Sequence, residues 1–153
     1  MHAILSQTAE YGLRAMVWIA GQPPGEPLLA RDVSAATGIP VEYLSKILRR
    51  LVLAGVLESR KGRGGGFMLS RPAEKISFRN VLEAVDAYPI EDRCAFGWGV
   101  CSRSRPCPLH SSWEAISSAF QKWAAESNLG DSGAQSSPRA AKRRTAPRAR
   151  RKR

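Results

Sequence analysis

Residues 30–54 read ARDVSAATGIPVEYLSKILRRLVLA, and this stretch decides the fold. The pattern predicts a short helix over Ala30–Thr37 that stops at Gly38, a residue type that readily takes the left-handed conformation of a helix end. Pro40 is tolerated in a first helical turn, so a second helix is expected to follow it and to run to Ala54. The apolar residues of this second helix fall at i, i+3, i+4 and i+7, and they are Leu44, Ile47, Leu48 and Leu51. The stretch therefore predicts two helices joined by a tight turn, the second with one buried apolar face.

A β-hairpin is predicted directly after these helices. Two short strand-like runs, Val56–Ser59 and Gly66–Leu69, flank the loop sequence RKGRGG at residues 60–65. The glycines of the loop allow positive φ angles and a close approach to another molecule. The cationic residues of the loop are Arg60, Lys61 and Arg63. Two helices, a tight turn and a hairpin with a basic tip together form a helix-turn-helix with a wing.

Three further helices are expected around this unit. The first runs from the N-cap Ser6 to Ala20, another from Ser77 to about Ala87, and the last from about Leu109 to Ser127. The last helix carries a mainly aromatic stripe, formed by Trp113, Ile116, Phe120 and Trp123. Such a stripe on a terminal helix favours an interface with a second copy, and packing within one chain is the alternative. The expected fold class is mainly α with a small β-hairpin: a winged helix-turn-helix domain plus a long C-terminal dimerisation helix.

The polar face of the helix after Pro40 is suited to the major groove of double-stranded DNA. Residues near its N-terminus are expected to reach base edges, and these are Glu42, Tyr43, Ser45 and Lys46. Arg49 and Arg50 are better placed for phosphates, while the three wing cations suit the backbone or the minor groove. A solvated basic face, or a protein–protein module built from the same helices, is the alternative. The combination of this helix with the cationic wing favours DNA as the partner.

The charge of the chain is uneven. Its 153 residues include 24 Lys and Arg against 13 Asp and Glu, for a formal net charge of +11. From Asp131 onward there are nine Lys or Arg and one acid, so this segment carries +8 and leaves +3 for residues 1–130. Without apolar periodicity, the segment is expected to be a disordered basic tail that strengthens DNA binding or only keeps the chain soluble. The predicted domains are residues 1–75 for DNA binding, 76–130 for a cluster-binding loop and dimerisation helices, and 131–153 for the tail.

All three cysteines lie in one predicted loop, CAFGWGVCSRSRPC at residues 94–107. Soft thiolates gathered on a loop suit an iron–sulfur cluster or zinc, and the nearby imidazole of His110 either completes the ligand set or caps the last helix. Structural zinc sites usually have roughly two to four residues between paired cysteines, so the wider gaps here favour an iron–sulfur cluster. Three unconnected surface cysteines are the plainest alternative. The candidate metal ligands are Cys94, Cys101 and Cys107.

Three sequence strings and the cysteines together resemble one known family. The strings are EYGLRAM at residues 10–16, EYLSKIL at 42–48 and GRGGGF at 62–67. In this order they resemble the IscR/NsrR-type regulators, and the similarity extends from Leu5 to Ser127. The resemblance implies a homodimeric winged-helix repressor or activator that reads a palindromic operator and holds a [2Fe–2S] or [4Fe–4S] cluster on the three cysteines. Members of this family sense cluster supply, nitric oxide, oxygen or cellular redox state.

The resemblance offers two residues as the fourth cluster ligand. His110 falls where IscR-type members have a histidine, and Glu10 falls where NsrR-type members supply a carboxylate from the partner subunit's first helix. A glutamate in a first helical turn is also favoured simply by the helix dipole, and His110 is the preferred ligand. Ser45 departs from the IscR-type pattern, in which an acidic residue helps to separate classes of DNA site. Operator preference therefore does not transfer to this chain.

Other functional classes find little support in the sequence. Only two histidines are present, no phosphate-binding glycine loop follows a strand, and no paired carboxylates stand out, so neither an enzyme activity nor a small-molecule substrate is expected. No apolar run approaches the roughly 18 residues of a membrane span, and the N-terminal sequence lacks a secretory pattern, so a cytoplasmic location is expected. The predicted function is a sequence-specific transcriptional repressor controlled by an iron–sulfur cluster. The alternative is a thiol-switch or zinc-containing winged-helix repressor without such a cluster.

Overall fold

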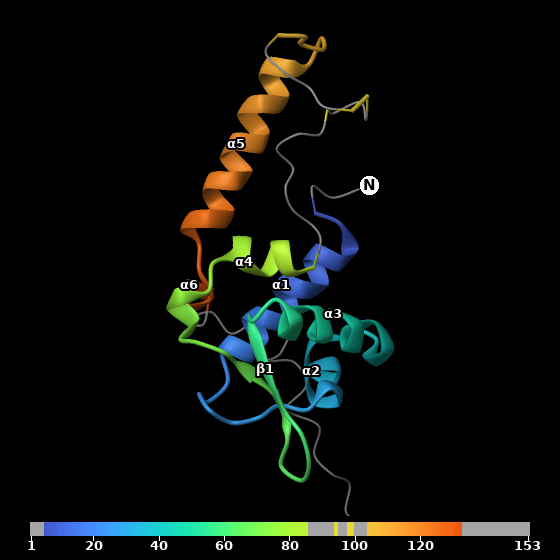
Figure 1. The fold of residues 1–153 in the computed structure, drawn as a ribbon, viewed down its shortest axis with the longest axis vertical. Helices are drawn as coiled ribbons and strands as arrows, with labels where there is room; N and C mark the ends of the chain where they lie inside the picture. The colour runs from blue at the N-terminus through green and yellow to red at the C-terminus, as the bar shows by residue number, and fades with distance from the viewer. Residues whose placement is uncertain (1–4, 86–93, 95–97, 100–103, 133–153) are drawn as a thin grey trace, which may run out of the picture.

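The computed structural model describes residues 5–85, 94, 98–99 and 104–132. Its elements in chain order are α1 (Gln7–Ala20), α2 (Ala30–Thr37), α3 (Val41–Leu53), β1 (Leu57–Arg60), β2 (Gly66–Leu69), the 3-10 turn η1 (Ala73–Lys75), α4 (Phe78–Ala84), α5 (His110–Glu126) and α6 (Leu129–Ser132). Figure 1 shows α1 to α4 and the hairpin gathered in one body, from which α5 extends on the side away from the hairpin tip. The architecture is mainly helical with one small antiparallel sheet, as predicted.

Local capping fixes the ends of the first three helices. Ser6 begins α1, because its Oγ accepts a hydrogen bond from the backbone N–H of Ala9 at 3.2 Å. Gly38 ends α2 with a φ of 72°, and Gly55 follows α3 with a φ of 70°. Both glycines lie in the left-handed region, where a side chain would add strain. The predicted ends of these helices are confirmed to within one residue.

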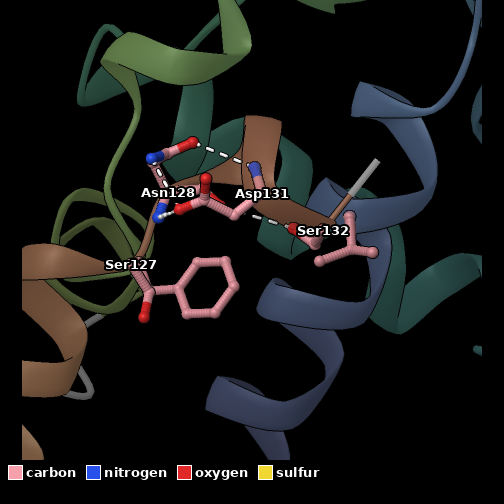
Figure 2. Close-up of a pocket in the computed structure, with 6 residues that line it drawn as sticks. Ser127, Asn128, Asp131 and Ser132 are labelled. Atoms are coloured by element: carbon pink, nitrogen blue, oxygen red, sulfur yellow. Dashed lines mark hydrogen bonds between the residues drawn. The ribbon is translucent and has the colours of Figure 1, made fainter. Parts of the chain in front are cut away.

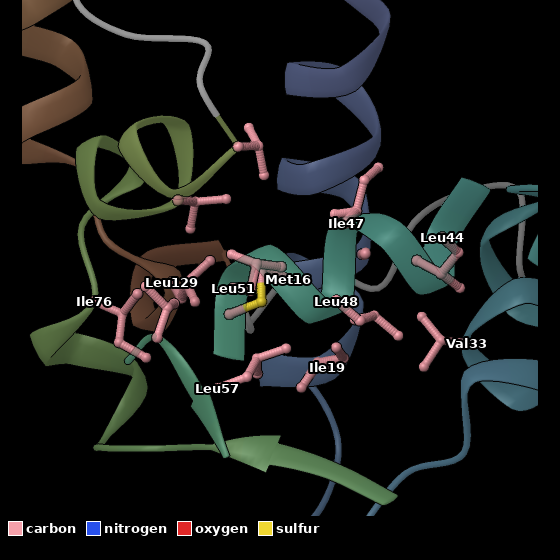
Figure 3. Close-up of a cluster of buried hydrophobic side chains, with 14 of the residues drawn as sticks. Met16, Ile19, Val33, Leu44, Ile47, Leu48, Leu51, Leu57, Ile76 and Leu129 are labelled. Carbon is pink, nitrogen blue, oxygen red and sulfur yellow. The ribbon is translucent and has the colours of Figure 1, made fainter. Parts of the chain in front are cut away.

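The apolar stripe of α3 lies at the centre of the core (Figure 3). Its four buried members are Leu44, Ile47, Leu48 and Leu51. Around them lie Met16 and Ile19 of α1, Val33 of α2, Leu57 of β1, Ile76, and Leu129 of α6. Burial of one such aliphatic side chain contributes roughly 1.5–3 kcal/mol, so this contact surface holds α3 firmly in one orientation. The opposite face of α3 is consequently turned outward.

The hairpin gains a third strand-like segment that the sequence analysis did not anticipate. β1 and β2 pair antiparallel in a register that sets Arg60 opposite Gly66. Leu28, in the connection between α1 and α2, pairs with Phe67 through two backbone hydrogen bonds of 2.8 Å each. Glycine at position 66 permits this approach, since a Cβ there would lie 2.5 Å from the carbonyl oxygen of Leu28. The root of the wing is therefore held from both sides.

Two short segments join α4 and α6 to the body. Ser77 and Asn80 form a capping box at the start of α4, with hydrogen bonds of 3.2 Å and 3.1 Å between side chain and backbone. Ser77 also forms an isolated antiparallel bridge with Asn128, just before α6. The Asn128 side-chain amide donates to Asp131 at 2.7 Å. These contacts hold α6 against α1 and η1.

A hollow of about 370 Å³ lies beside these contacts (Figure 2). It is lined by Val17, Phe78, Ser127, Asn128, Asp131 and Ser132. Its polar side chains are mostly engaged with one another, because Asn128 and Asp131 bond reciprocally and Ser132 donates to the carbonyl oxygen of Leu129 at 3.1 Å. The hollow is thus a by-product of how α6 is held.

α5 packs on the body by one end only. Among its residues, Ser117 and Ala124 are buried. The ring of Trp123 lies 5.2 Å from that of Phe78 in α4, centroid to centroid, while Ile116 remains 51% exposed. The predicted stripe of α5 is therefore divided. Its C-terminal end packs within the chain, as the alternative interpretation held, and its middle faces outward.

The predicted boundaries differ from the structure in three places. β1 begins at Leu57 and not at Val56, because the Val56 N–H donates to the carbonyl oxygen of Leu51 in the turn that closes α3. Ordered structure continues beyond residue 130 to Ser132, where a disordered tail was predicted, because the buried Leu129 anchors α6 in the core. The predicted continuation of α4 to residue 87 and the tail from residue 133 lie outside the described residues. Within the described ranges, no helix has the length and apolar character that crossing a membrane requires.

Candidate nucleic-acid interface and cysteine site

The outward face of α3 carries most of the residues predicted to contact DNA. Glu42, Ser45, Lys46 and Arg49 are all exposed, on the side opposite the buried stripe. The Ser45 hydroxyl donates to the carbonyl oxygen of Val41 at 2.7 Å, which leaves its lone pairs directed to solvent. Because the stripe anchors the helix, these side chains project from a rigid rod. This is the geometry that major-groove reading requires.

Tyr43 differs from its neighbours on this face, because it contacts α1. Its hydroxyl lies 2.7 Å from Oγ1 of Thr8, close enough for a hydrogen bond in either direction. Its ring meets the ring of Tyr11 edge to face, with centroids 5.5 Å apart and an interplanar angle of 89°. Sequence reasoning placed Tyr43 among the base-reading residues and gave no sign of Thr8, since no local pattern links positions 35 residues apart.

Arg50 also has a partner inside the molecule. Its Nη1 donates to the backbone carbonyl oxygen of Val85 at 3.2 Å, at the C-terminal end of α4. Val85 is buried and lies against α1, where a Cβ on Gly12 would come within 3.2 Å of its Cγ1. The guanidinium therefore ties α3 to α4 where α1 passes. The predicted phosphate contact of Arg50 has to coexist with this bond.

The wing presents its three cations at one end of the molecule (Figure 1). Arg60, Lys61 and Arg63 are exposed. Gly62 and Gly64 have φ angles of 90° and 71°, so the loop turns through conformations that other residues rarely adopt. The Gly65 N–H donates to the carbonyl oxygen of Gly62 at 3.0 Å and closes the turn. The basic tip is thus a defined turn on a paired hairpin.

Arg71 holds the exit of the hairpin, and the sequence analysis did not single it out. Its guanidinium and Nε donate to the carbonyl oxygens of Gly55 and Lys75 at 3.1 Å each and to Oδ1 of Asn80 at 3.2 Å. These bonds join the end of α3, the turn η1 and the start of α4. A lone arginine after a strand has no sequence signature for this role.

The cysteine site is described in part. Cys94 is buried, with 6% of its surface exposed, and its N–H donates to the carbonyl oxygen of Gly99 at 3.1 Å. Cys107 is half-buried, and its carbonyl oxygen accepts from the N–H of His110 at 3.0 Å. Cys101 lies outside the described residues. The structure thus brings Cys107 and His110 together in one turn at the start of α5.

The two candidate fourth ligands have different surroundings. The half-buried His110 has its Nε2 4.0 Å from an oxygen of Glu114, one turn further along α5. Glu10 lies in the first turn of α1 and is half-buried. In the described part of the chain, no three His, Cys, Asp or Glu side chains converge into a metal-binding group.

A helix-turn-helix anchored by a buried stripe, followed by a paired wing with a basic tip, defines the class of winged-helix DNA-binding transcriptional regulators. Comparison with known proteins supplies the particular family. Residues 5–132 match the Rrf2 family, described as iron-dependent transcriptional regulators. The chain belongs to the Rrf2 family. It is therefore a transcriptional regulator with a DNA-binding fold and not an enzyme.

Individual relatives agree with this assignment. The chain is 34% identical to Rv1287 of Mycobacterium tuberculosis over 128 residues, which are 83% of this chain and 79% of the relative. It is 30% identical to the HTH-type transcriptional regulator IscR of Escherichia coli over 127 residues, 83% of this chain and 78% of IscR. The resemblance to IscR-type regulators is confirmed at the level of the family.

Solved structures share the fold. CymR, the global cysteine regulator of B. subtilis, superposes with a TM-score of 0.73 at 20% identity and covers 88% of this chain and 98% of its own. IscR of T. potens superposes with a TM-score of 0.66 at 21% identity and covers 86% of each chain. At this level of identity, both comparisons establish the winged-helix fold.

Proposed function

We propose that this chain is a sequence-specific repressor of transcription whose binding to DNA is controlled by an iron–sulfur cluster. The observation that carries the DNA-binding half is the exposed polar and basic face of α3, anchored from behind and accompanied by a cationic wing. Glu42, Ser45 and Lys46 reach base edges in the major groove, and Arg49 contacts phosphates. The wing cations follow the backbone or enter the minor groove.

The proposed active form is a homodimer on a palindromic operator. Two recognition helices read adjacent half-sites when they lie about 34 Å apart, which one winged-helix unit alone does not provide. Large apolar side chains remain exposed on α5, where Ile116 is 51% and Trp123 is 40% accessible. Such exposure supports α5 as the surface that meets a second copy. Residues 1–75 then bind DNA, and residues 76–130 hold the cluster and the dimer contact.

The donor set has the chemistry that an iron–sulfur cluster requires. Thiolates from Cys94, Cys101 and Cys107 are its preferred ligands, and an imidazole from His110 or a carboxylate from Glu10 completes the set. A bound [2Fe–2S] or [4Fe–4S] cluster supplies a centre that responds to nitric oxide, to redox state or to cluster supply. Cys107 and His110 occupy the turn that begins α5. Whatever holds these two residues therefore also fixes the start of the proposed dimerisation helix.

A second candidate is a winged-helix repressor that uses its cysteines without iron, as a thiol switch or a zinc site. The partial exposure of Cys107 favours a thiol switch, because an accessible thiol is open to oxidation. Both candidates share the same DNA-binding surface, so metal content separates them.

The test is an absorption spectrum with iron and sulfide quantification on anaerobically purified protein. We expect visible cluster bands that bleach on exposure to nitric oxide or oxygen. Cys107→Ala should lose iron and bands, while Ser104→Ala, a substitution in the same segment at an exposed residue, should keep them. A protein that is colourless after anaerobic reconstitution, or that contains only zinc, would overturn the cluster mechanism and leave the DNA-binding half intact.

DNA binding is tested by selection of an operator from a pool of random duplexes. Lys46→Ala should weaken binding to the selected operator, whereas Ala36→Ser on the exposed side of α2 should bind normally. Recovery of no preferred duplex, with folded wild-type protein both with and without cluster, would refute sequence-specific binding.

A further inference from the structure

The first turn of α3 lacks the cap that normally holds a helix N-terminus. Its N-cap residue is Pro40, which makes no side-chain hydrogen bond to the exposed N–H groups of the turn. The first four N–H groups of a helix have no partner within the helix, so an uncapped first turn opens easily. Yet this turn carries Glu42 and precedes Ser45 and Lys46, the residues proposed to read bases. Something else has to hold it.

α1 provides that hold through Tyr43. The Tyr43 hydroxyl lies 2.7 Å from Oγ1 of Thr8, and its ring packs edge to face on Tyr11 at 5.5 Å. α1 and α3 contact each other inside the body shown in Figure 1. The bond therefore joins the first turn of α3 to the first turn of a helix that the core already fixes.

The α1 side of this contact is itself organised. The Gln7 side-chain amide donates to the Tyr11 hydroxyl at 3.1 Å. The guanidinium of Arg14 lies over the Tyr11 ring, 5.4 Å from its centroid. Tyr11 is thus held on two sides before it meets Tyr43. The contact surface for Tyr43 is part of α1 and needs no DNA to form.

We propose that Tyr43 is a positioning residue for DNA recognition, which acts through its bond to Thr8 and sets the first turn of α3 in the reading geometry. This inference rests on the proposed function, because it assigns the turn that reads bases. It changes the role expected for Tyr43 from a direct base contact to a tether. The Tyr43 hydroxyl is then specified by Thr8 and not by the operator.

Removal of each end of the bond separates the two roles. Tyr43→Phe keeps the ring on Tyr11 and loses the hydroxyl, Thr8→Val loses the partner oxygen at nearly constant shape, and Thr8→Ser keeps that oxygen. We expect Tyr43→Phe and Thr8→Val each to weaken operator binding about three- to fivefold relative to a scrambled duplex, the range of one lost hydrogen bond. The double variant should be no weaker than the worse single variant, and Thr8→Ser should bind like wild type.

Two patterns in the binding data would overturn the inference. If Tyr43→Phe weakens selective binding and Thr8→Val does not, the hydroxyl contacts DNA directly. If both variants bind like wild type, the bond does not position the turn. Additive losses in the double variant would likewise place the two hydroxyls in separate roles.

A second measurement needs no DNA and therefore distinguishes failure of the inference from failure of the proposed function. Amide hydrogen exchange of Leu44 to Ile47 in the uncomplexed protein should accelerate about three- to fivefold in both Tyr43→Phe and Thr8→Val, with no change at Leu82 in α4. Unchanged exchange in either variant would refute the tether. Faster exchange in a protein that selects no operator would uphold the tether and refute sequence-specific DNA binding instead.

Discussion

Replacement of Gly65 by alanine is expected to disable the wing without unfolding the protein. Gly65 is buried at the base of the loop, and its φ angle is not among the positive ones, so the effect of a Cβ is purely steric. The added Cβ would overlap with the carbonyl oxygen of Arg60 and lie 2.9 Å from that of Gly62. Both neighbours are backbone atoms, which cannot rotate away. The turn has to open by about 1 Å, at a cost of about 2 kcal/mol.

The expected loss in DNA binding follows from the charges that this turn positions. Each phosphate contact contributes about 0.9 to the slope of the logarithm of affinity against the logarithm of salt concentration. If two of the three wing cations lose their contacts, the slope becomes shallower by about 2. This corresponds to a roughly tenfold smaller change in affinity between about 50 and 200 mM salt. The assay is fluorescence anisotropy with the selected operator at several salt concentrations.

Gly64→Ala is the matched control. Gly64 has a φ of 71° with open space around its Cβ position, so alanine there adds about 1 kcal/mol of backbone strain and displaces nothing. Its salt slope should stay at the wild-type value. If Gly65→Ala keeps the wild-type slope, or if Gly64→Ala loses as much, the wing does not bind DNA in the way argued above.

Three further predictions concern α3 and the tail. Arg49→Gln should lower the salt slope of operator binding by about 1 with unchanged stability, whereas Arg50→Gln, which loses its bond to Val85, should lower the free energy of unfolding by about 1 kcal/mol in a urea titration. The reverse assignment would contradict the structure. Leu48→Ala empties a fully buried position and should destabilise the protein by about 3 kcal/mol; a loss below about 1 kcal/mol would show that the site is less tightly packed. Deletion of residues 133–153, which removes nine Lys and Arg and spares α6, should flatten the salt dependence and leave the selected operator sequence unchanged. A changed operator preference would mean that the tail reads bases.

The sequence by itself determined the features that depend on near neighbours. The spacing of Leu44, Ile47, Leu48 and Leu51 specified which face of α3 is buried, because helical periodicity is a local property. Ser6, Gly38 and Gly55 marked helix ends through capping and left-handed φ angles, which also act within a few residues. The glycine-rich basic loop predicted the wing for the same reason. The ordered combination of these local signals was enough for the fold and the family.

Only the tertiary structure decided which side chains serve the site and which hold it in place. Tyr43 and Arg50 share the exposed face of α3 with Lys46 and Arg49, and nothing in their spacing distinguishes the two pairs. Their partners are Thr8 and the carbonyl oxygen of Val85, each 35 residues away. The pairing of Leu28 with Phe67 and the burial of Leu129 likewise join segments distant in the chain. Such contacts depend on how helices cross, and helix crossing is set by the packing of the whole core and not by any one stretch of sequence.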